Sequence, residues 1–381
     1  MRYLCGNMPR HSNRGLALKA GKEFIKGNEA ICRGAINCGC RYYYGYPITP
    51  QNDIPEYMSA HLHDIGGVYL QAESEIATIN FIIGTAATGK RVMTSSSGPG
   101  ISLMQEGISY MAGMELPAVI VNISRSGPGL GGINPSQGDY FQATRGGGHG
   151  DYRTLVFAPH TVQEMYDLTM RAFDVAERYR NPVMILGDAI IGQMKEPFLE
   201  RSYEPSGKFD RSWVIEGCAG RDTRQVTSLY LKGNSIEVHN LKLAEKYRIM
   251  KKETSFEDYM AGDAKILLIA FGTSARVCKT AIQWARNDGI RAGLLRPVTL
   301  FPFPESCVKD MVNSAEKVVV VEMNTGQMID DVRSSTTEHE KLESYCRPCQ
   351  MLTPEEIFRV IKEKELVRLG NAKGKAREKS I

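Results

Sequence analysis

The sequence predicts an α/β protein with a parallel β-sheet in its first domain and a second, smaller α/β unit behind it. Strand-like and helix-like patterns alternate through residues 67–100, with connections of the lengths that a parallel sheet requires. A buried apolar run, a glycine turn and a helical pattern at 265–287 begin the same alternation again. Between these regions, residues 199–262 are polar and mixed in charge, which is typical of a linker.

This pattern divides the chain of 381 residues into five parts. Residues 1–21 show no periodicity and are expected to form a disordered extension. The remaining parts are a first domain at 22–198, the linker at 199–262, a second domain at 263–368 and a basic tail at 369–381.

The first domain is expected to begin with a helix at 30–40 and an aromatic, β-like run at 42–46. That run ends in Pro47-Ile48-Thr49-Pro50, where two prolines fix the backbone and leave the Thr49 hydroxyl on a rigid loop after a strand. A proline-rich strand exit without any function explains the same residues. Thr49 is therefore a candidate site residue whose role depends on what lies near it.

Residues 67–100 form the unit around which the chain is organised. The expected elements are a strand at 68–70, a helix from 74 that Gly89 stops, a strand at 91–94 and a helix at 101–112. In the first of these helices, four apolar residues are spaced to line one face: Ile76, Ile79, Ile82 and Ile83.

Glu75 lies in the first turn of this helix, where free backbone N–H groups stabilise a carboxylate by roughly 0.3–1 kcal/mol. Ligands of parallel sheets gather at the carboxyl ends of the strands, and segments 71–75 and 95–100 both follow strands. An ordinary capping box is the alternative explanation for Glu75. A functional role for this carboxylate therefore needs support from the rest of the chain.

A buried strand at 118–123 leads to Arg125 and a glycine-rich loop at 126–132. This loop contains the letters G-x-G-x-x-G, the signature of dinucleotide-binding helices. Pro128 interrupts it, however, and residues 133–136 cannot open the phosphate-binding helix that the signature needs. A stand-alone nicotinamide dehydrogenase is therefore a weak alternative, although so long a glycine-dense loop is typical of a functional site.

The remaining elements complete two α/β units. A helix at 161–179 and a strand at 181–188 close the first domain, and a charged helix at 238–252 leads to the second. Further strands of the second domain are expected at 291–295 and 317–321.

Composition excludes several classes of protein. Hydrophobic and charged contents of 42% and 24% are typical of a soluble globular protein, and a net charge of +4 is too small to argue for nucleic acid. No apolar run approaches the ~18 residues of a membrane helix, and no signal peptide is recognisable. Nine cysteines favour a reduced, cytoplasmic protein. Neither close pair, Cys38 with Cys40 nor Cys346 with Cys349, has the second pair that a closed metal site needs, so no metal is predicted.

Taken together, the loops resemble those of the 2-oxoacid:ferredoxin oxidoreductases, in the alpha-type subunit with the pyrimidine-binding domain for thiamine diphosphate. The resemblance covers residues 23–364, and its second domain is similar to the C-terminal domain of transketolase. The motifs are Tyr46–Pro50, Ala72–Glu75, Thr94–Gly100, Gln105–Gly107, Arg125 with its loop, Gln137–Asp139 and Glu322–Gln327. Loops 138–144 and 146–151 are closest in style to the 3-methyl-2-oxobutanoate (2-oxoisovalerate) type.

The resemblance implies a role for each candidate residue. Glu75 would hydrogen-bond N1′ of the cofactor's aminopyrimidine and help to remove the proton from C2 of its thiazolium. Thr49 would lie near the substrate, and Arg125 would face the carboxylate of the 2-oxoacid. The other residues that would bind the cofactor are Pro47, Ile48, Ser97 and Gly98.

Two differences from the family pattern are informative. Residues 346–350 read Cys-Arg-Pro-Cys-Gln where the family usually has a glycine pair, so this loop is expected to be rebuilt, at a place outside the proposed site. The chain also lacks the Gly-Asp-Gly motif that holds the diphosphate through Mg²⁺, and it lacks ligands for iron–sulfur clusters. The resemblance therefore implies half of an active site, completed by a beta-type subunit with thiamine diphosphate and Mg²⁺. Gamma-type and ferredoxin-like subunits with iron–sulfur clusters would join it.

The implied reaction is the oxidative decarboxylation of a 2-oxoacid, best 3-methyl-2-oxobutanoate, to acyl-CoA and CO₂. Coenzyme A would be the co-substrate and ferredoxin the electron acceptor, with no nucleic-acid or membrane partner. The alternatives are the same chemistry on 2-oxoglutarate or pyruvate, and a non-catalytic assembly subunit. The presence of Thr49, Glu75 and Arg125 together argues against the assembly subunit.

Overall fold

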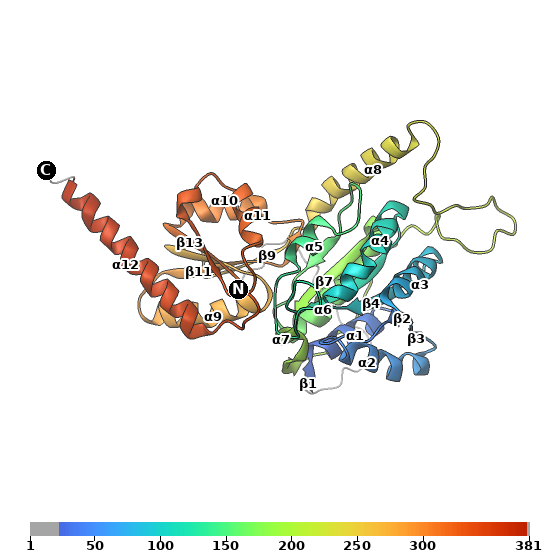
Figure 1. The fold of residues 1–381 in the computed structure, drawn as a ribbon, viewed down its shortest axis with the longest axis horizontal. Coiled ribbons are helices and arrows are strands. Elements are labelled where there is room, and N and C mark those ends of the chain that lie inside the picture. Colours follow the sequence, from blue (N-terminus) through green and yellow to red (C-terminus); the bar gives the residue numbers. More distant parts are fainter. Residues whose placement is uncertain (1–22, 379–381) are drawn as a thin grey trace.

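A seven-stranded sheet forms the centre of the first domain in the computed structural model, which describes residues 23–378 (Figure 1). Its strand order is β12-β6-β7-β5-β4-β2-β3. The strands are β2 (Tyr42–Gly45), β3 (Val68–Gln71), β4 (Val92–Ser96), β5 (Ala118–Ser124), β6 (Leu155–Phe157), β7 (Pro182–Asp188) and β12 (Thr299–Phe301). Every neighbouring pair is parallel except β12 with β6. The predicted parallel sheet is confirmed, and the extension predicted at 1–21 lies outside the described residues.

The centre of this sheet is its most buried part. Strands β5 and β7 pair in register over seven residues, from Ala118 opposite Pro182 to Ser124 opposite Asp188, and all fourteen residues are buried. Because helices cover parallel sheets, such central strands are apolar on both faces, as these are. The helices are α1 (Gly27–Asn37), α2 (Asp53–His61), α3 (Glu75–Ala87), α4 (Pro99–Met114), α5 (Tyr140–Arg145), α6 (Val162–Tyr179) and α7 (Ala189–Gln193). Two further strands, β1 (Glu23–Lys26) and β8 (Lys195–Phe198), form an antiparallel pair.

Helix α3 differs from its prediction at one position. Ile79 and Ile82 are buried as expected, but Ile76 is 50% exposed. The buried face of α3 starts at Glu75 and continues at the spacing of a helix turn through Ile79 and Ile82, so Ile76 is rotated away from it. Glu75 therefore lies on the buried face of α3, where the apolar pattern had placed Ile76.

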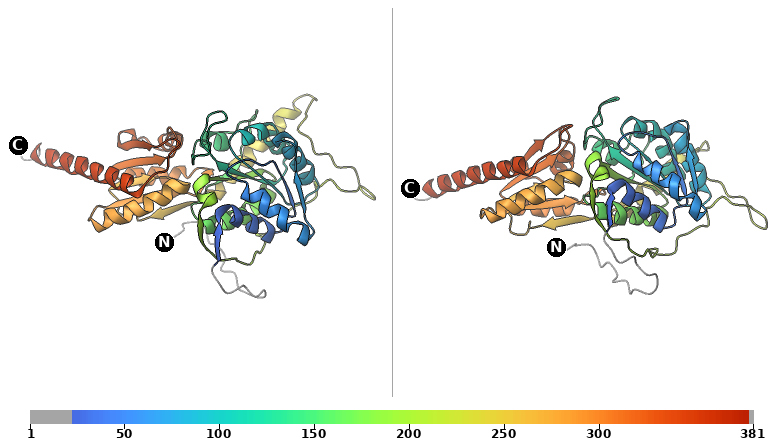
Figure 2. Two further views of the ribbon diagram at one scale, coloured as in Figure 1. Left: turned by 60° about the horizontal axis from the view of Figure 1, so that its bottom comes forward. Right: turned by 90° about the horizontal axis from the view of Figure 1, so that it is seen from below.

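The second domain is built on a five-stranded sheet of order β14-β13-β10-β11-β9. Its strands are β9 (Phe256–Tyr259), β10 (Ile266–Ile269), β11 (Ala292–Pro297), β13 (Lys317–Glu322) and β14 (Leu342–Cys346). All pairs are parallel except β9 with β11. Its helices are α9 (Gly272–Asn287), α10 (Glu305–Ser314), α11 (Met328–Ser334) and α12 (Pro354–Glu378), and α12 extends beyond the rest of the domain (Figure 2).

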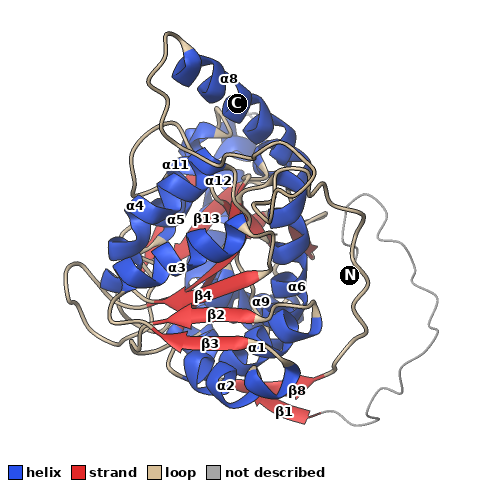
Figure 3. Cartoon of the chain, turned by 90° about the vertical axis from the view of Figure 1, so that its right-hand side faces the viewer, coloured by secondary structure: helices blue, strands red, loops and turns tan. Residues whose placement is uncertain are grey.

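The division of the chain into five parts remains a prediction, and four features depart from it. Strand β9 lies in the predicted linker but belongs to the second sheet, whereas β12 lies in the predicted second domain but completes the first sheet. Within the linker, Ile215 donates a backbone hydrogen bond to Ala87 at the end of α3. Helix α8 (Ser235–Met250), labelled in Figure 3, corresponds to the charged helix that was predicted at 238–252. Helix α12 continues into the tail predicted at 369–381.

A cluster of buried charges joins the two domains. Arg296 of β11 is fully buried, and its guanidinium lies 2.7 Å from Glu164 of α6 and 2.7 Å from Glu257 of β9. Lys279 of α9 donates to Glu257 at 2.7 Å and to His160 at 2.8 Å. Burial opposes ionisation of Glu164, but Arg296 and His160 overcome it and lower the pKa of this carboxyl to about 2. The cluster is therefore ionised and holds α6 of the first domain to β9, α9 and β11 of the second.

We expect Arg296→Met to lower the free energy of unfolding by about 3–5 kcal/mol, because it leaves two buried carboxylates with one cation fewer. Urea unfolding of the purified chain measures this loss. Arg248→Met is the matched control, since the Arg248 guanidinium is exposed and pairs with Glu245 on the same helix; this change should leave the free energy of unfolding nearly unchanged. Equal losses in the two variants would contradict a stabilising role for the cluster.

Candidate functional site

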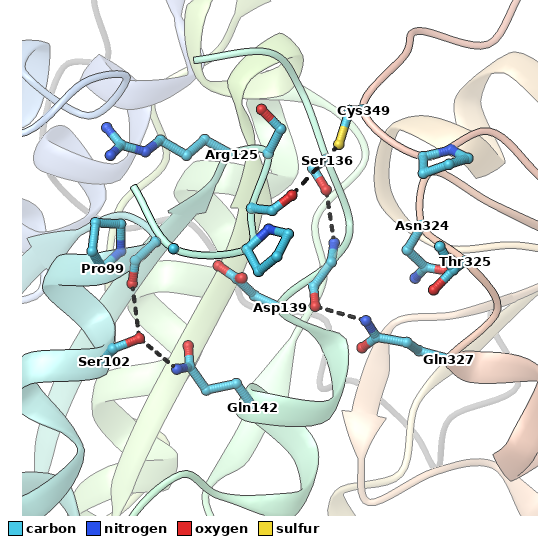
Figure 4. Close-up of a pocket in the computed structure, with 17 residues that line it drawn as sticks. Pro99, Ser102, Arg125, Ser136, Asp139, Gln142, Asn324, Thr325, Gln327 and Cys349 are labelled. Carbon is cyan, nitrogen blue, oxygen red and sulfur yellow. Dashed lines mark hydrogen bonds between the residues drawn. The ribbon is translucent and has the colours of Figure 1, made fainter. Parts of the chain in front are cut away.

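A cavity of about 420 Å³ lies where the carboxyl ends of β4 and β5 meet the second domain (Figure 4). Three segments of the first domain and two loops of the second line it. The lining residues are Gly98, Pro99, Ser102, Arg125, Ser126, Gly127, Pro128, Gly129, Ser136, Gly138, Asp139, Gln142, Asn324, Thr325, Gln327, Pro348 and Cys349. This is the sheet edge at which the sequence predicts a site. The loop at 346–350 was predicted to lie outside the site, whereas the structure places Pro348 and Cys349 in the lining of the cavity.

The turn from β4 into α4 brings unpaired hydroxyl groups to this edge. The hydroxyls of Thr94, Ser96 and Ser97 are buried and have no hydrogen-bond partner among the described residues. Gly98 has a φ of +46°, a backbone conformation that favours glycine. Buried hydroxyls without partners are uncommon, so this turn is a suitable place for a ligand.

Glu75 lies next to this turn, as the first residue of α3. Ser74 caps the helix by accepting a hydrogen bond from the Ala77 amide at 3.2 Å, so the cap does not need the Glu75 side chain. Glu75 is only 6% exposed, whereas Glu73 is exposed. Within the described part of the chain, no hydrogen bond or ion pair reaches the Glu75 carboxyl group. A buried carboxyl group without a partner is costly, which favours a ligand contact over the alternative of a simple helix cap.

Gly100 keeps Glu75 close to the serine turn. A Cβ atom at this glycine would lie 2.1 Å from Ser96 Oγ and 2.4 Å from Glu75 Oε1. Real Cβ atoms do not approach other atoms so closely, so any side chain at position 100 would displace one of these two groups. Because Gly100 has no side chain, the carboxyl group of Glu75 can lie against the start of α4.

Arg125 lies at the end of β5 and is 8% exposed. Its guanidinium donates to two carbonyl oxygens, that of Thr49 at 2.9 Å and that of Leu130 at 3.1 Å, while its Nε is buried without a partner. No carboxylate of the described residues forms an ion pair with it, so pairing with Asp139 or Asp151 does not account for its burial. Figure 4 draws the guanidinium on the Pro99 side of the cavity. The cavity wall therefore carries a buried cation that makes no ion pair.

Asp139 is a cavity residue that the sequence did not single out as a site residue. Its carboxyl group accepts a hydrogen bond from Asn122 Nδ2 at 2.9 Å. Burial raises the pKa of Asp139, while Asn122, Ser124 and Arg125 oppose the rise. The only sequence signal for Asp139 was its place in the motif Gln137–Asp139. Asp139 lies seventeen residues after Asn122 in the sequence, and the loop brings it back to β5.

Hydrogen bonds to the second domain hold this loop in place. Gln137 donates from Nε2 to Phe271 O at 2.9 Å, and its Oε1 accepts from Ser274 Oγ at 2.7 Å and from the Met323 amide at 3.1 Å. Gln327 in turn donates to Gly138 O at 2.8 Å and accepts from the Phe141 amide at 2.8 Å. The second domain therefore fixes the loop that carries Asp139.

The structure brings the predicted site residues together to different degrees. Gly98 and Arg125 line the cavity, and Thr49 contacts Arg125 through its backbone carbonyl, with its side chain exposed. Ser97 is buried directly before Gly98. Pro47 is exposed and Ile48 is half-buried. Neither of them lines the cavity, and neither do Glu75, Ser97 and Thr49.

The glycine loop after Arg125 does not form a dinucleotide-binding turn. The Gly132 amide donates to Ser126 O at 2.9 Å, which closes the loop on itself, and an isolated bridge pairs Arg125 with Pro135. The next helix, α5, begins only at Tyr140. A phosphate-binding helix is therefore not present where the G-x-G-x-x-G letters would need it.

The described residues contain neither a candidate metal site nor a candidate membrane-spanning helix. Across residues 23–378, no group of three or more His, Cys, Asp or Glu side chains is arranged to hold a metal ion. No helix in the same range is both long enough and apolar enough to cross a membrane.

Two family models match most of the chain. Residues 33–248 match the model described as the thiamine diphosphate-binding domain of pyruvate flavodoxin/ferredoxin oxidoreductase. Residues 264–353 match core domain II of pyruvate:ferredoxin oxidoreductase. Together they cover every segment that lines the cavity and every strand of the two large sheets except β9.

Individual relatives agree with these matches. The chain is 49% identical over 317 residues to the ketoisovalerate oxidoreductase subunit VorB of Methanothermobacter thermautotrophicus, covering 82% of this chain and 90% of that protein. It is 40% identical over 351 residues to the 2-oxoglutarate synthase subunit KorA of Archaeoglobus fulgidus, covering 89% of this chain and 98% of that protein.

Solved structures show the same fold. A 2-oxoglutarate:ferredoxin oxidoreductase from Magnetococcus marinus, with 2-oxoglutarate, coenzyme A and succinyl-CoA bound, matches with a TM-score of 0.79 and 27% identity. The match covers 90% of this chain and 65% of that chain, so this chain spans about two thirds of its length. A split-gene transketolase matches with a TM-score of 0.56 and 11% identity, a likeness of fold alone.

We expect Gly100→Ala to destabilise the chain by about 1–3 kcal/mol, because its methyl group would overlap Ser96 and Glu75. Gly84→Ala is the matched control: Gly84 lies within α3, and a Cβ there meets nothing within 4 Å. That change should stabilise the helix by about 0.5–1 kcal/mol. Urea unfolding of both variants measures the difference, and equal stabilities would show that the turn is not tightly packed.

Proposed function

The chain belongs to the 2-oxoacid:ferredoxin oxidoreductase family, as its alpha-type subunit, and we propose that it forms half of an active site for 3-methyl-2-oxobutanoate. The reaction is oxidative decarboxylation to an acyl-CoA and CO₂ with reduction of ferredoxin. Identity of 49% to a ketoisovalerate oxidoreductase subunit, against 40% to a 2-oxoglutarate synthase subunit, favours the branched-chain acid. The same chemistry on 2-oxoglutarate or pyruvate is the alternative.

The observation that carries this proposal is the buried, unpartnered carboxyl group of Glu75 at the end of the sheet. Thiamine diphosphate, when bound, supplies the carbon that attacks the 2-oxo group and takes up the electron pair left by CO₂. Its aminopyrimidine needs a carboxyl group at N1′, and Glu75 has an unused hydrogen-bonding group of that kind. Beside Glu75, the Ser97 hydroxyl has no hydrogen-bond partner and can contact a polar ligand. Gly98 has no side chain and leaves space for that ligand. The residues of this turn therefore fit the cofactor.

We assign Glu75 the task of holding and passing the proton at N1′, which is general acid–base work suited to a carboxyl group. Pro47, Ile48, Ser97 and Gly98 are assigned to cofactor contact, and Thr49 to the substrate. Pro47 and Thr49 are exposed, as suits residues that a cofactor shared between subunits would cover. Their assignment rests on the family motif.

Arg125 is assigned to the carboxylate of the 2-oxoacid. A guanidinium without a counter-ion in a nearly buried wall is stabilised by a bound carboxylate, which supplies the missing charge. Arg125 and Asp139 are the charged side chains among the described residues lining the cavity. A second carboxylate on the substrate would meet Asp139 and no second cation, which favours an uncharged side chain over that of 2-oxoglutarate.

Partner subunits complete the proposed site. A beta-type subunit would hold the diphosphate through Mg²⁺, and gamma-type and ferredoxin-like subunits would carry iron–sulfur clusters to ferredoxin. Near Glu75, the side chains of Ile76, Phe81 and Leu103 are exposed on α3 and α4, which supports a protein partner over this face. Coenzyme A is assigned as co-substrate.

The cysteines among the described residues are free thiols, which favours a cytoplasmic location.

We expect the complex assembled with its partner subunits to reduce a viologen dye with 3-methyl-2-oxobutanoate and CoA, and the isolated chain to reduce none. The kcat/KM for this acid should exceed that for 2-oxoglutarate by at least about 100-fold, because a second carboxylate would be buried without a partner. Equal kcat/KM values would move the assignment to the alternative substrate. Turnover by the isolated chain would contradict the half-site.

The role of Glu75 is separable from that of its neighbour Glu73. In the assembled complex, Glu75→Gln should slow hydrogen–deuterium exchange at C2 of bound thiamine diphosphate by at least about 100-fold without lowering the unfolding temperature. Glu73→Gln is the matched control: its carboxylate is exposed, and the exchange rate should stay near that of the wild type. Loss of exchange in the Glu73 variant instead would show that the assignment is wrong by two residues.

A further inference from the structure

We propose that Pro348 and Cys349, in the loop after β14, form the wall of the cavity that contacts the side chain of the 2-oxoacid and limits its size. This inference rests on the proposed function and adds a specificity determinant from the second domain. Both residues line the cavity. Their side chains, a pyrrolidine ring and a thiol on a methylene group, narrow the cavity and make this part of its wall less polar.

The backbone of Cys349 is in the left-handed region, with a φ of +58°. Only three other non-glycine residues among those described have a positive φ: Glu115, Arg180 and Met260. Glycine adopts this conformation without a steric cost, whereas a residue with a Cβ atom does not. Strained residues of this kind gather at functional sites, so the presence of a side chain at position 349 needs a reason in the cavity that it lines.

The loop is anchored firmly enough to act as a wall. The Arg347 amide donates to Glu322 O at 3.0 Å, and the Arg347 guanidinium lies 2.8 Å from Glu356 of α12. On the other side, Asn134 Nδ2 donates to Cys349 O at 3.5 Å, and Cys349 Sγ lies 4.0 Å from Gly127 O. The loop of the second domain therefore spans to the glycine loop that follows Arg125.

The second-domain side of the lining combines polar and apolar residues. Figure 4 draws the Arg125 guanidinium on the side of the first domain, and Cys349, Asn324, Thr325 and Gln327 on the side of the second. With its carboxylate at Arg125, an acid reaches toward this opposite side with its alkyl group. Within that side, Pro348 and Cys349 offer carbon and sulfur, which suit a short branched alkyl chain and carry no charge for a second carboxylate.

Enlarging the cavity at this wall tests the inference. In the assembled complex, Cys349→Gly should raise the ratio of kcat/KM for 4-methyl-2-oxopentanoate to that for 2-oxobutanoate by about 10-fold, the usual effect of one or two methylene groups in an apolar pocket. The variant also relieves the left-handed strain, so it should fold. Cys346→Ser is the matched control: Cys346 lies on β14 outside the cavity lining, and its ratio should equal that of the wild type.

Alkylation provides a measurement that does not depend on turnover. Without CoA, 3-methyl-2-oxobutanoate should slow the labelling of Cys349 by N-ethylmaleimide in the wild-type complex by at least about 5-fold, an effect of direct shielding. Mass spectrometry locates the label. Cys218, which is exposed in the linker, should be labelled at the same rate with and without the acid.

The outcomes distinguish this inference from the function on which it rests. An unchanged ratio and no protection of Cys349, in a complex that turns over 3-methyl-2-oxobutanoate, would overturn the inference and leave the proposed function standing. A changed KM for CoA with an unchanged ratio would also overturn it, because the wall would then belong to the coenzyme. A wild-type complex that acts on no 2-oxoacid would contradict both the proposed function and this inference.

Discussion

The hydrogen bonds of Gln137 across the domain seam hold the cavity in one shape. Both polar atoms of its amide bind groups of the second domain, at Phe271, Ser274 and Met323. A slide of one domain on the other would leave these groups buried and unpaired, at a cost of about 1–3 kcal/mol for each. Gly138 and Asp139 follow Gln137 directly, so the same bonds place a cavity residue of the first domain with reference to the second.

Glu322 supports the other half of this seam. Its buried carboxyl group accepts hydrogen bonds from the amides of Gln327, Met328 and Ile329 and from the Asn324 side chain, at 2.7–3.1 Å. These hydrogen bonds fix the turn between the end of β13 and the start of α11. The turn places Asn324 and Gln327 against the first domain. The charged cluster around Arg296 acts at a separate point of the same seam, so the two domains are held together at more than one place.

Local patterns sufficed for most of the fold, because the spacing of apolar residues is a property of short segments. The strands near residues 68, 92, 118 and 182 and the parallel sheet they form were predicted in this way. Glu75 and Arg125 were singled out because they follow strands, and their burial without an ion pair agrees with that choice, while their roles remain proposals. Asp139, Cys349 and β12 were not predicted as parts of this sheet or cavity. Each owes its place to contacts between segments far apart in the sequence, such as Gly127 with Cys349, and no local pattern reports them.

Strand β12 has a consequence for how the chain is made. The ribosome completes residues 23–198 long before residues 299–301, yet these later residues cover the outer edge of the first sheet at β6. Until they arrive, β6 is an open edge with unpaired backbone groups, the kind of surface to which other chains add strands. A protein shortened to the first domain would therefore be expected to aggregate through this edge.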